Sequence, residues 1–305
     1  MIILDGGLAT ELEARGHDLS DALWSARLLA DDPAAIVAAH EAFFRAGARI
    51  ATTASYQASF EGFAARGLDA RQTAALLRRS VELARKAGAV TGGRRWVAAS
   101  VGPYGAALAD GSEYRGRYGL SVARLTAFHQ PRAEALAEAE PDVLALETVP
   151  DVDEAVAMLA AIEGLGLPAW LSYTIEGDRT RAGQPIEEAF AVAAGRDEVV
   201  AVGVNCCDPD DAARAVTVAR EVSGKPVIAY PNSGEEWDAR ARRWSGRARF
   251  SPDRVAGADL AGGCCRVEPA AIATLAATQV GESPGHRPSG GTGGPADSFA
   301  QSVGK

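Results

Sequence analysis

The chain has 305 residues, a formal net charge of −9 and 47% hydrophobic residues. This length buries a sizeable core without staples and fits one large domain or two smaller ones. The acidic balance argues against a nucleic-acid partner, because phosphate binding needs clustered Lys and Arg. The start of the chain lacks signal-peptide features, and no apolar run approaches the ~20 residues of a membrane span. We therefore expect a cytoplasmic protein with reduced thiols and no membrane partner.

Short apolar runs alternate with longer helical patterns. Near-continuous apolar strands separated by helices are typical of a parallel sheet covered on both faces. The eight runs cover residues 1–4, 48–55, 96–102, 143–149, 169–174, 199–205, 226–232 and 257–263. Eight such units predict an α/β fold, a single-domain (β/α)8 TIM barrel, with a doubly wound open sheet as the alternative.

The helical patterns lie between these runs, at 33–46, 69–88, 121–139, 151–163, 209–222 and 267–277. Pro33 and Pro209 each follow an aspartate, a pairing that favours a helix start. His40 lies on the apolar stripe of the first helix, so we expect a packed structural histidine. His17, His129 and His286 show no pattern of partners.

The composition changes after residue 280. Residues 281–305 are rich in Gly, Pro and Ser and have too few apolar side chains to order themselves. We expect a barrel over residues 1–280 and a disordered tail over residues 281–305. The "GGTGG" of the tail is no nucleotide loop, because no strand precedes it.

The chain has four cysteines, arranged as the adjacent pairs Cys206-Cys207 and Cys264-Cys265. Both pairs follow predicted strands, at the end of the barrel where catalytic residues gather. Adjacent strand residues point to opposite faces, but Gly262 and Gly263 are expected to free the backbone so that both following thiols turn toward the barrel mouth. Cys206, Cys264 and Cys265 would then form a soft ligand set with one open position, which suits a catalytic zinc ion.

Other interpretations of the cysteines remain open. Each one is also compatible with a small buried hydrophobic side chain. Cys207 is expected to face away from Cys206, although a closed structural zinc site with Cys207 as the fourth ligand is an alternative. A disulfide between Cys264 and Cys265 would be strained and is not expected in a reducing compartment.

Polar residues follow the other strands at the same end. Glu147 ends a buried strand, and a buried carboxylate without a partner is costly, so it requires a cation or a ligand. Asp5 is either a ligand-binding residue or the cap of a turn with Gly6 and Gly7. Further candidates at the strand ends are Thr53, Tyr56, Asn205 and Asn232.

Several segments together resemble the zinc-dependent homocysteine S-methyltransferase family. They are "LDGGLATELEARG", "AGARIATTASYQASF", "SVGPYGAALADGSEYRGRYG", "ALETVP", "VGVNCC", "YPNSGEEWD" and "GGCCRVEP". The resemblance spans residues 1 to 277 and implies a (β/α)8 barrel. Asn-Cys after the sixth strand combined with Gly-Gly-Cys-Cys after the eighth is its most specific feature.

The resemblance implies zinc as cofactor, with Cys206, Cys264 and Cys265 as ligands and catalytic residues. Asp5, Gly6 and Gly7 would hold the amino-acid end of homocysteine, and Glu147 would pair with its ammonium. Thr53, Asn205 and Asn232 would line the mouth, and Tyr56 would face the methyl donor.

The segments "ALWSARLL" and "SYQASF" resemble the branch that uses S-methylmethionine or S-adenosylmethionine rather than betaine. The implied reaction is methyl transfer from this donor to homocysteine, which gives methionine. The alternatives are a non-catalytic zinc-holding barrel and a methyltransferase of the same fold that uses betaine or acts on another thiol or a selenol. A Schiff-base aldolase is excluded, because no lysine ends a predicted strand.

Overall fold

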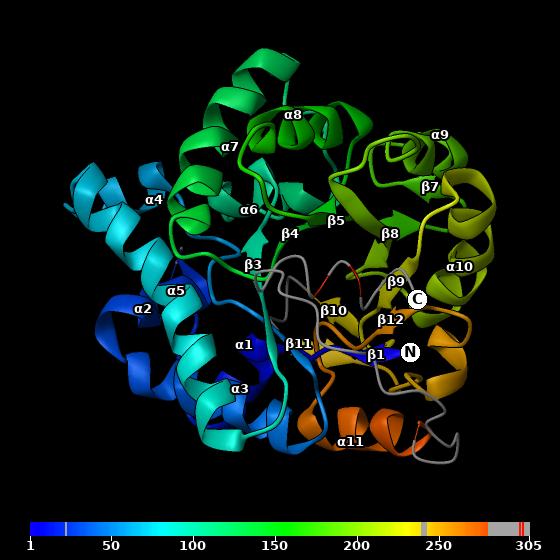
Figure 1. The fold of residues 1–305 in the computed structure, drawn as a ribbon, viewed down its shortest axis with the longest axis horizontal. Helices are drawn as coiled ribbons and strands as arrows, with labels where there is room; N and C mark the ends of the chain where they lie inside the picture. The colour runs from blue at the N-terminus through cyan, green and yellow to red at the C-terminus, as the bar shows by residue number, and fades with distance from the viewer. Residues whose placement is uncertain (22, 239–242, 280–298, 300, 302–305) are drawn as a thin grey trace.

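Eight parallel strands form one sheet that closes into a barrel (Figure 1). The computed structural model describes all residues except 22, 239–242, 280–298, 300 and 302–305. In spatial order the strands are β1 (Ile2–Ile3), β12 (Leu260–Ala261), β9 (Val227–Tyr230), β8 (Val199–Asn205), β5 (Ala169–Tyr173), β4 (Val143–Val149), β3 (Trp96–Val101) and β2 (Ile50–Thr52). A parallel bridge between Leu4 and Ile50 joins the first strand to the last. The predicted TIM barrel is therefore confirmed, and all eight predicted strands are present.

Helices surround the barrel and connect its strands. They are α1 (Leu8–Ala14), α2 (Leu28–Asp31), α3 (Pro33–Arg45), α4 (Phe60–Ala64), α5 (Ala70–Thr91), α6 (Tyr104–Leu108), α7 (Val122–Ala137), α8 (Val152–Ile162), α9 (Ile186–Ala191), α10 (Pro209–Ser223) and α11 (Pro269–Ala277). Short 3-10 turns lie at η1 (Trp24–Arg27), η2 (Ser112–Tyr114) and η3 (Pro252–Val255). None of the described helices has the length and apolar character required to cross a bilayer.

The predicted helix starts are confirmed by their caps. Asp32 accepts a hydrogen bond from the Ala35 amide ahead of Pro33, and Asp208 caps α10 through Asp210. Two antiparallel hairpins extend from the connections: β6 (Ile175–Glu176) with β7 (Arg179–Thr180), and β10 (Glu236–Asp238) with β11 (Arg243–Ser245).

The apolar core has two parts. One lies between the sheet and the helices, and the other fills the barrel interior. Trp170 and Trp96 are the largest interior side chains. Phe299 packs edge to face on Trp96 with ring centroids 5.7 Å apart, and its side chain is completely buried. Apart from Phe299 and Gln301, the predicted disordered tail lies outside the described residues.

Candidate metal centre and active site

Three thiols meet at the carboxyl end of the barrel. Cys206 follows β8, and Cys264 and Cys265 lie just beyond β12. Their sulfur atoms all lie within 4.8 Å of one another, and the Cys206 and Cys265 sulfurs are 3.8 Å apart. All are free thiols, and this spacing is far longer than the ~2.05 Å of a disulfide. The convergence predicted from the strand ends is therefore present.

Cys207 does not belong to this thiol cluster. Its side chain is buried in the apolar core between sheet and helices. Burial and the charge of Cys206 raise the pKa of the Cys207 thiol well above its usual value. Cys207 faces away from Cys206, as predicted, and within the described part of the chain only three side chains form the candidate metal site.

The backbone reason given for this convergence was wrong. Gly262 and Gly263 keep negative φ angles, and the chain instead turns at Cys206 (φ 51°) and Arg266 (φ 63°). A left-handed residue other than glycine costs roughly 1–2 kcal/mol, so the surrounding structure must stabilise this geometry. The two glycines are needed for space. A Cβ on Gly263 would lie 2.2 Å from a Val267 methyl, and one on Gly262 would lie 2.6 Å from the Asp5 carbonyl.

Gly6 and Gly7 form the other side of this tight contact. A Cβ on Gly6 would lie 2.3 Å from the Val267 carbonyl, and one on Gly7 would lie 2.6 Å from the Cys264 carbonyl. The Gly7 amide donates to Val267, and the Gly263 amide donates to Asp5. The segment after β1 and the loop after β12 therefore hold each other in place. Gly6 and Gly7 fix the position of the Cys264 backbone, and their contact with substrate remains a prediction.

The thiol cluster suits a soft metal ion. The Cys264 and Cys265 thiols donate hydrogen bonds to the Cys206 sulfur and lower the pKa of Cys206 well below its usual value. This arrangement favours one thiolate beside two thiols, whereas a metal ion would make all three thiolate ligands. Three thiolates fit the ligand preference of zinc and leave its usual fourth position to another molecule. The residues present therefore fit the zinc ion expected from the sequence.

Two buried carboxyl groups lie beside the cluster. Asp5 accepts hydrogen bonds from the Thr52 amide (2.8 Å) and hydroxyl (3.1 Å). Burial raises the pKa of Asp5 to about 8, with the charge of Glu147 as a smaller contribution to the same shift. Burial likewise raises the pKa of Glu147 to about 7, with the charge of Cys206 as an additional cause. Both groups therefore lack a compensating cation, and a bound ammonium would supply one.

A hydrogen-bond network connects the Glu147 carboxylate to side chains of the barrel interior. The Ser100 hydroxyl donates to one carboxylate oxygen, and the Tyr230 hydroxyl donates to the other at 3.0 Å. Trp170 donates its indole N–H to the Tyr230 oxygen at 3.1 Å, which links the site to the barrel interior. Glu147 is thus fixed in orientation before any ligand binds.

The remaining predicted residues lie at the same mouth with their polar atoms engaged. Thr53 bonds to Ser55 and accepts from the Ser100 amide. Asn205 bonds through both side-chain atoms to Thr148 and accepts from Ser172. The Asn232 side chain accepts from the Cys265 amide at 3.1 Å. These three residues support the site geometry. Tyr56 hydrogen bonds to Thr148, and its pKa is raised by burial and, to a smaller extent, by the charges of Glu113 and Cys206.

Three residues without a predicted role reach the cluster from the loops around it. The Tyr114 hydroxyl lies 3.1 Å from the Cys206 sulfur. Arg181 lies over the Tyr114 ring, 5.8 Å from its centroid, and its charge lowers the pKa of Cys206. Burial and the charge of Cys206 raise the pKa of Glu113 to about 7. The signal for Glu113 and Tyr114 was the long Gly-rich segment 102–121, because a connection of this length often carries functional residues. Arg181 follows β7 and had no such signal.

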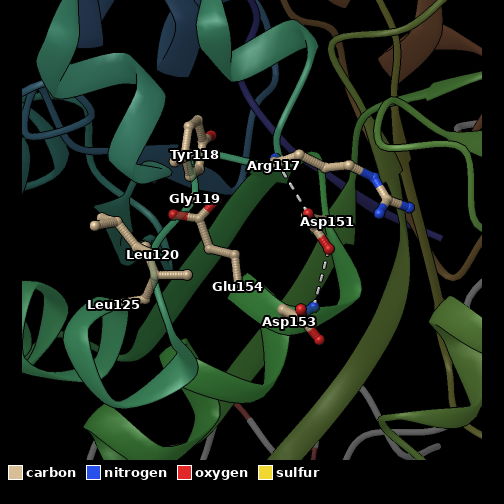
Figure 2. Close-up of a pocket in the computed structure, with 8 residues that line it drawn as sticks. All are labelled: Arg117, Tyr118, Gly119, Leu120, Leu125, Asp151, Asp153 and Glu154. Atoms are coloured by element: carbon tan, nitrogen blue, oxygen red, sulfur yellow. Dashed lines mark hydrogen bonds between the residues drawn. The ribbon is translucent and has the colours of Figure 1, made fainter.

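A separate pocket of about 240 Å³ lies between the segment 117–120 and the start of α8 (Figure 2). Asp151, Asp153 and Glu154 line its acidic side, and none of the three cysteines borders it.

Glu154 is fully buried and lies 3.0 Å from the His129 ring nitrogen. His129, which shows no partner pattern in the sequence, therefore has a buried partner in the fold. The partner is a residue on the next helix, which sequence spacing does not reveal.

His40 is packed in the core, as predicted. It is fully buried, and burial lowers its pKa to about 4, so it is neutral at pH 7. Lys86 lies in α5 and Lys225 lies just before β9, which agrees with the exclusion of a Schiff-base aldolase. His286 lies outside the described residues.

Comparison with known proteins extends this geometry. The model of the homocysteine S-methyltransferase family matches residues 2–279. The chain belongs to this family. Homocysteine S-methyltransferase of Escherichia coli (strain K12) is 45% identical, over 91% of this chain and 94% of its own. Selenocysteine Se-methyltransferase of Brassica oleracea var. italica is 39% identical, over 90% of this chain and 88% of its own.

Solved structures agree with this assignment. The metallated form of the homocysteine methyltransferase MmuM from Escherichia coli is 44% identical, with a TM-score of 0.80. The match covers 91% of this chain and 96% of that structure. The family resemblance drawn from the sequence motifs is therefore confirmed, and this member of the homocysteine S-methyltransferase family is a methyltransferase with a thiol cluster at its barrel mouth.

Proposed function

We propose that this chain transfers a methyl group from S-methylmethionine, or from S-adenosylmethionine, to the thiol of homocysteine and so forms methionine. The observation that carries the proposal is the meeting of three thiols within 4.8 Å of one another beside two buried carboxyl groups, Asp5 and Glu147. The thiols suit a zinc ion, and the carboxyl groups suit the ammonium of an amino acid. Homocysteine carries both a thiol and an ammonium.

Cys206, Cys264 and Cys265 would hold the zinc ion. When bound, zinc supplies a positive charge that favours the thiolate form of a thiol placed in its open position. A free thiol has a pKa of about 8.5, so reaching the thiolate at pH 7 costs about 2 kcal/mol at ~1.36 kcal/mol per unit. Removing this cost of about 2 kcal/mol would raise the rate only about thirtyfold, so activation of the thiol is the smaller part of catalysis.

Positioning supplies the larger part. Holding an acceptor sulfur in line with a donor methyl contributes roughly 7–11 kcal/mol. Glu147 is fixed by Ser100 and Tyr230, and Asp5 is fixed by Thr52, so an ammonium held between them would place the acceptor in one orientation. Binding that ammonium would also return both carboxyl groups to their charged forms, because a nearby cation lowers a carboxyl pKa.

The methyl donor would approach from the side of Tyr56. Attack on a sulfonium neutralises charge, and a site that excludes water favours such a step. In this proposal the new carbon–sulfur bond forms as the methyl–sulfonium bond breaks. Its electron pair stays on the donor sulfur, which leaves as a neutral thioether.

A donor panel tests the proposal. The purified protein is incubated with homocysteine and with S-methylmethionine, S-adenosylmethionine or betaine in turn, and methionine is followed with and without a chelator. We expect methionine from a sulfonium donor, loss of activity with chelator and recovery with added zinc. A zinc-loaded protein that is inactive with every donor would instead favour a non-catalytic zinc-holding barrel.

The panel also varies the acceptor. The 39% identity to an enzyme named selenocysteine Se-methyltransferase makes a selenol the second acceptor to test. A higher kcat/KM with selenocysteine than with homocysteine would overturn the acceptor named here. A cytoplasmic location accompanies the proposal, because the ligand cysteines and the acceptor must stay reduced.

A further inference from the structure

Glu113 lies in a rigid turn next to the thiol cluster. It belongs to η2 (Ser112–Tyr114), and the hydroxyl of the next residue, Tyr114, lies 3.1 Å from the Cys206 sulfur. The turn packs directly on α6, because a Cβ on Gly105 would lie 2.3 Å from the Glu113 amide nitrogen. The position of Glu113 is therefore set by the backbone of its own loop and by close contact with a glycine.

No positive charge is found among the neighbouring groups of the described chain that act on the Glu113 carboxylate. Its Oε2 atom is inaccessible to solvent and has no hydrogen-bond partner among the described residues. The neighbouring charges that act on it, those of Cys206 and Asp110, are both negative. A carboxylate in such surroundings is costly unless a ligand supplies the positive charge.

The other carboxyl groups of the site already have protein partners. Asp5 is held by Thr52, and Glu147 is held by Ser100 and Tyr230. A sulfonium donor brings a positive sulfur in addition to its own ammonium. Glu113 also acts on Tyr56 through its charge, and both residues interact with the charge of Cys206, so both side chains lie near the thiol cluster.

We propose that Glu113 recognises the sulfonium charge of the methyl donor and so sets the preference of this site for a cationic donor. The inference rests on the proposed methyl transfer and names one residue that recognises the positive charge of the donor. It also predicts a particular kinetic signature. The sulfonium loses its charge as the methyl leaves, so a carboxylate stabilises the bound donor at least as well as the transition state. Removing the carboxylate therefore weakens donor binding without lowering kcat.

The test compares Glu113→Gln with the wild type as zinc-loaded proteins. We expect the KM for S-methylmethionine to rise about tenfold or more, because a close charge pair of low exposure is lost. The KM for homocysteine and kcat should stay within about twofold, since neither depends on the donor charge. Glu163→Gln is the matched control, because it removes the same charge from an exposed position at the C-terminal end of α8. This control should leave every constant unchanged.

Calorimetry without homocysteine gives a second readout that does not depend on turnover. We expect Glu113→Gln to weaken binding of both S-methylmethionine and the trimethylsulfonium ion, which has a sulfonium but no ammonium. Weaker binding of S-methylmethionine alone would show that Glu113 reads the ammonium and would overturn the inference. Glu113→Asp, which keeps the charge, should recover part of the donor affinity, and thermal melting checks that each variant folds.

The two proposals fail in different ways. A wild-type protein that uses no sulfonium donor contradicts the proposed function. An active wild type whose donor affinity is unchanged by Glu113→Gln contradicts only the role of Glu113.

Discussion

At the amino ends of the strands, Trp96 and Phe299 pack edge to face, with Arg49 and Arg94 stacked over the indole at 5.4 and 5.2 Å. At the carboxyl ends, the barrel holds the buried Cys206 thiol, the partly buried Cys264 and Cys265 thiols, and the buried carboxyl groups of Asp5 and Glu147. Burial stabilises the first set of side chains through apolar contact. Burial of the second set is unfavourable, because it keeps charge from water.

Left-handed backbone geometry outside glycine occurs at both ends, at Glu140 (φ 50°) just before β4 and at several residues around the mouth. Thr148 (φ 58°), Cys206 (φ 51°) and Arg266 (φ 63°) adopt left-handed geometry directly after the mouth residues Glu147, Asn205 and Cys265. Strain and unpaired buried charge thus gather where a ligand would bind, and the apolar end supplies the stability that offsets them. Variants at the amino end should therefore lower stability and leave activity unchanged, whereas variants at the carboxyl end should mainly lower activity.

The largest expected effect is at the thiol cluster. Cys206→Ser should lose tightly bound zinc and lower methyl transfer at least about a thousandfold, because the acceptor is no longer positioned. Cys207→Ser is the matched control, since its side chain lies in the apolar core. It should lower stability but keep the metal. Elemental analysis and methionine formation check both variants, and an active, zinc-containing Cys206→Ser protein would refute the metal site.

The next effect is at the opposite end. Phe299→Ala should lower the free energy of unfolding by about 3 kcal/mol, because it leaves a cavity against Trp96. The activity of the folded protein should be unchanged. Urea titration measures the change. Gln301→Ala, at an exposed position, should shift stability by less than about 0.5 kcal/mol. An unchanged unfolding curve for Phe299→Ala would show that this end does not depend on Phe299.

Asp5 tests the cost of burial at the mouth. Its pKa is raised from 3.8 to about 8, so the folded state binds a proton that the unfolded chain has released. The stability contribution of Asp5 in the ligand-free protein is therefore lost as pH rises from about 4 to about 8. Asp5→Asn should flatten this dependence by at least roughly 2–3 kcal/mol, because asparagine has no proton to release over this interval.

Unfolding curves measured from pH 4 to 8 test this prediction. Asp178→Asn, whose side chain is 85% exposed, should follow the wild-type curve. If the wild type and Asp5→Asn show the same change in stability between pH 4 and pH 8, the pKa of Asp5 is not raised.

The smallest of these effects is at Glu147. Glu147→Gln should raise the KM for homocysteine at least about tenfold, because a hydrogen bond to a charged group contributes ~1.5–3 kcal/mol. Zinc content should be unchanged. Initial rates over a homocysteine series, with metal analysis on the same samples, measure both quantities. If zinc is lost in parallel, Glu147 supports the metal site instead of the substrate.

Much of the barrel could be predicted because its strands are apolar runs bounded by capped helices. The strand ends then placed Cys206, Cys264, Asp5 and Glu147 at one mouth without any further information. The cause of the thiol geometry could not be predicted in this way. In the sequence, Gly262 and Gly263 suggest a flexible backbone. In the fold, Gly262 contacts Asp5, more than 250 residues earlier in the chain, and Gly263 contacts Val267 across a turn. Only the fold reveals these two contacts.

The loop residues were missed for a related reason. Glu113 and Tyr114 lie on a segment with no helical or strand periodicity, so nothing in the pattern indicates which way they point. His129 and Glu154 lie on different helices, and their pairing depends on how α7 packs against α8. Phe299 is the one aromatic residue in the sequence of a Gly/Pro-rich tail, and composition averages over such residues.

X-ray absorption at the zinc edge tests the central claim most directly. It is recorded on the zinc-loaded protein before and after addition of homocysteine. We expect three sulfur ligands and one lighter atom in the absence of homocysteine and four sulfur ligands in its presence, because the acceptor thiol takes the position that Cys206, Cys264 and Cys265 leave open. A spectrum with four protein ligands that homocysteine does not change would contradict the account.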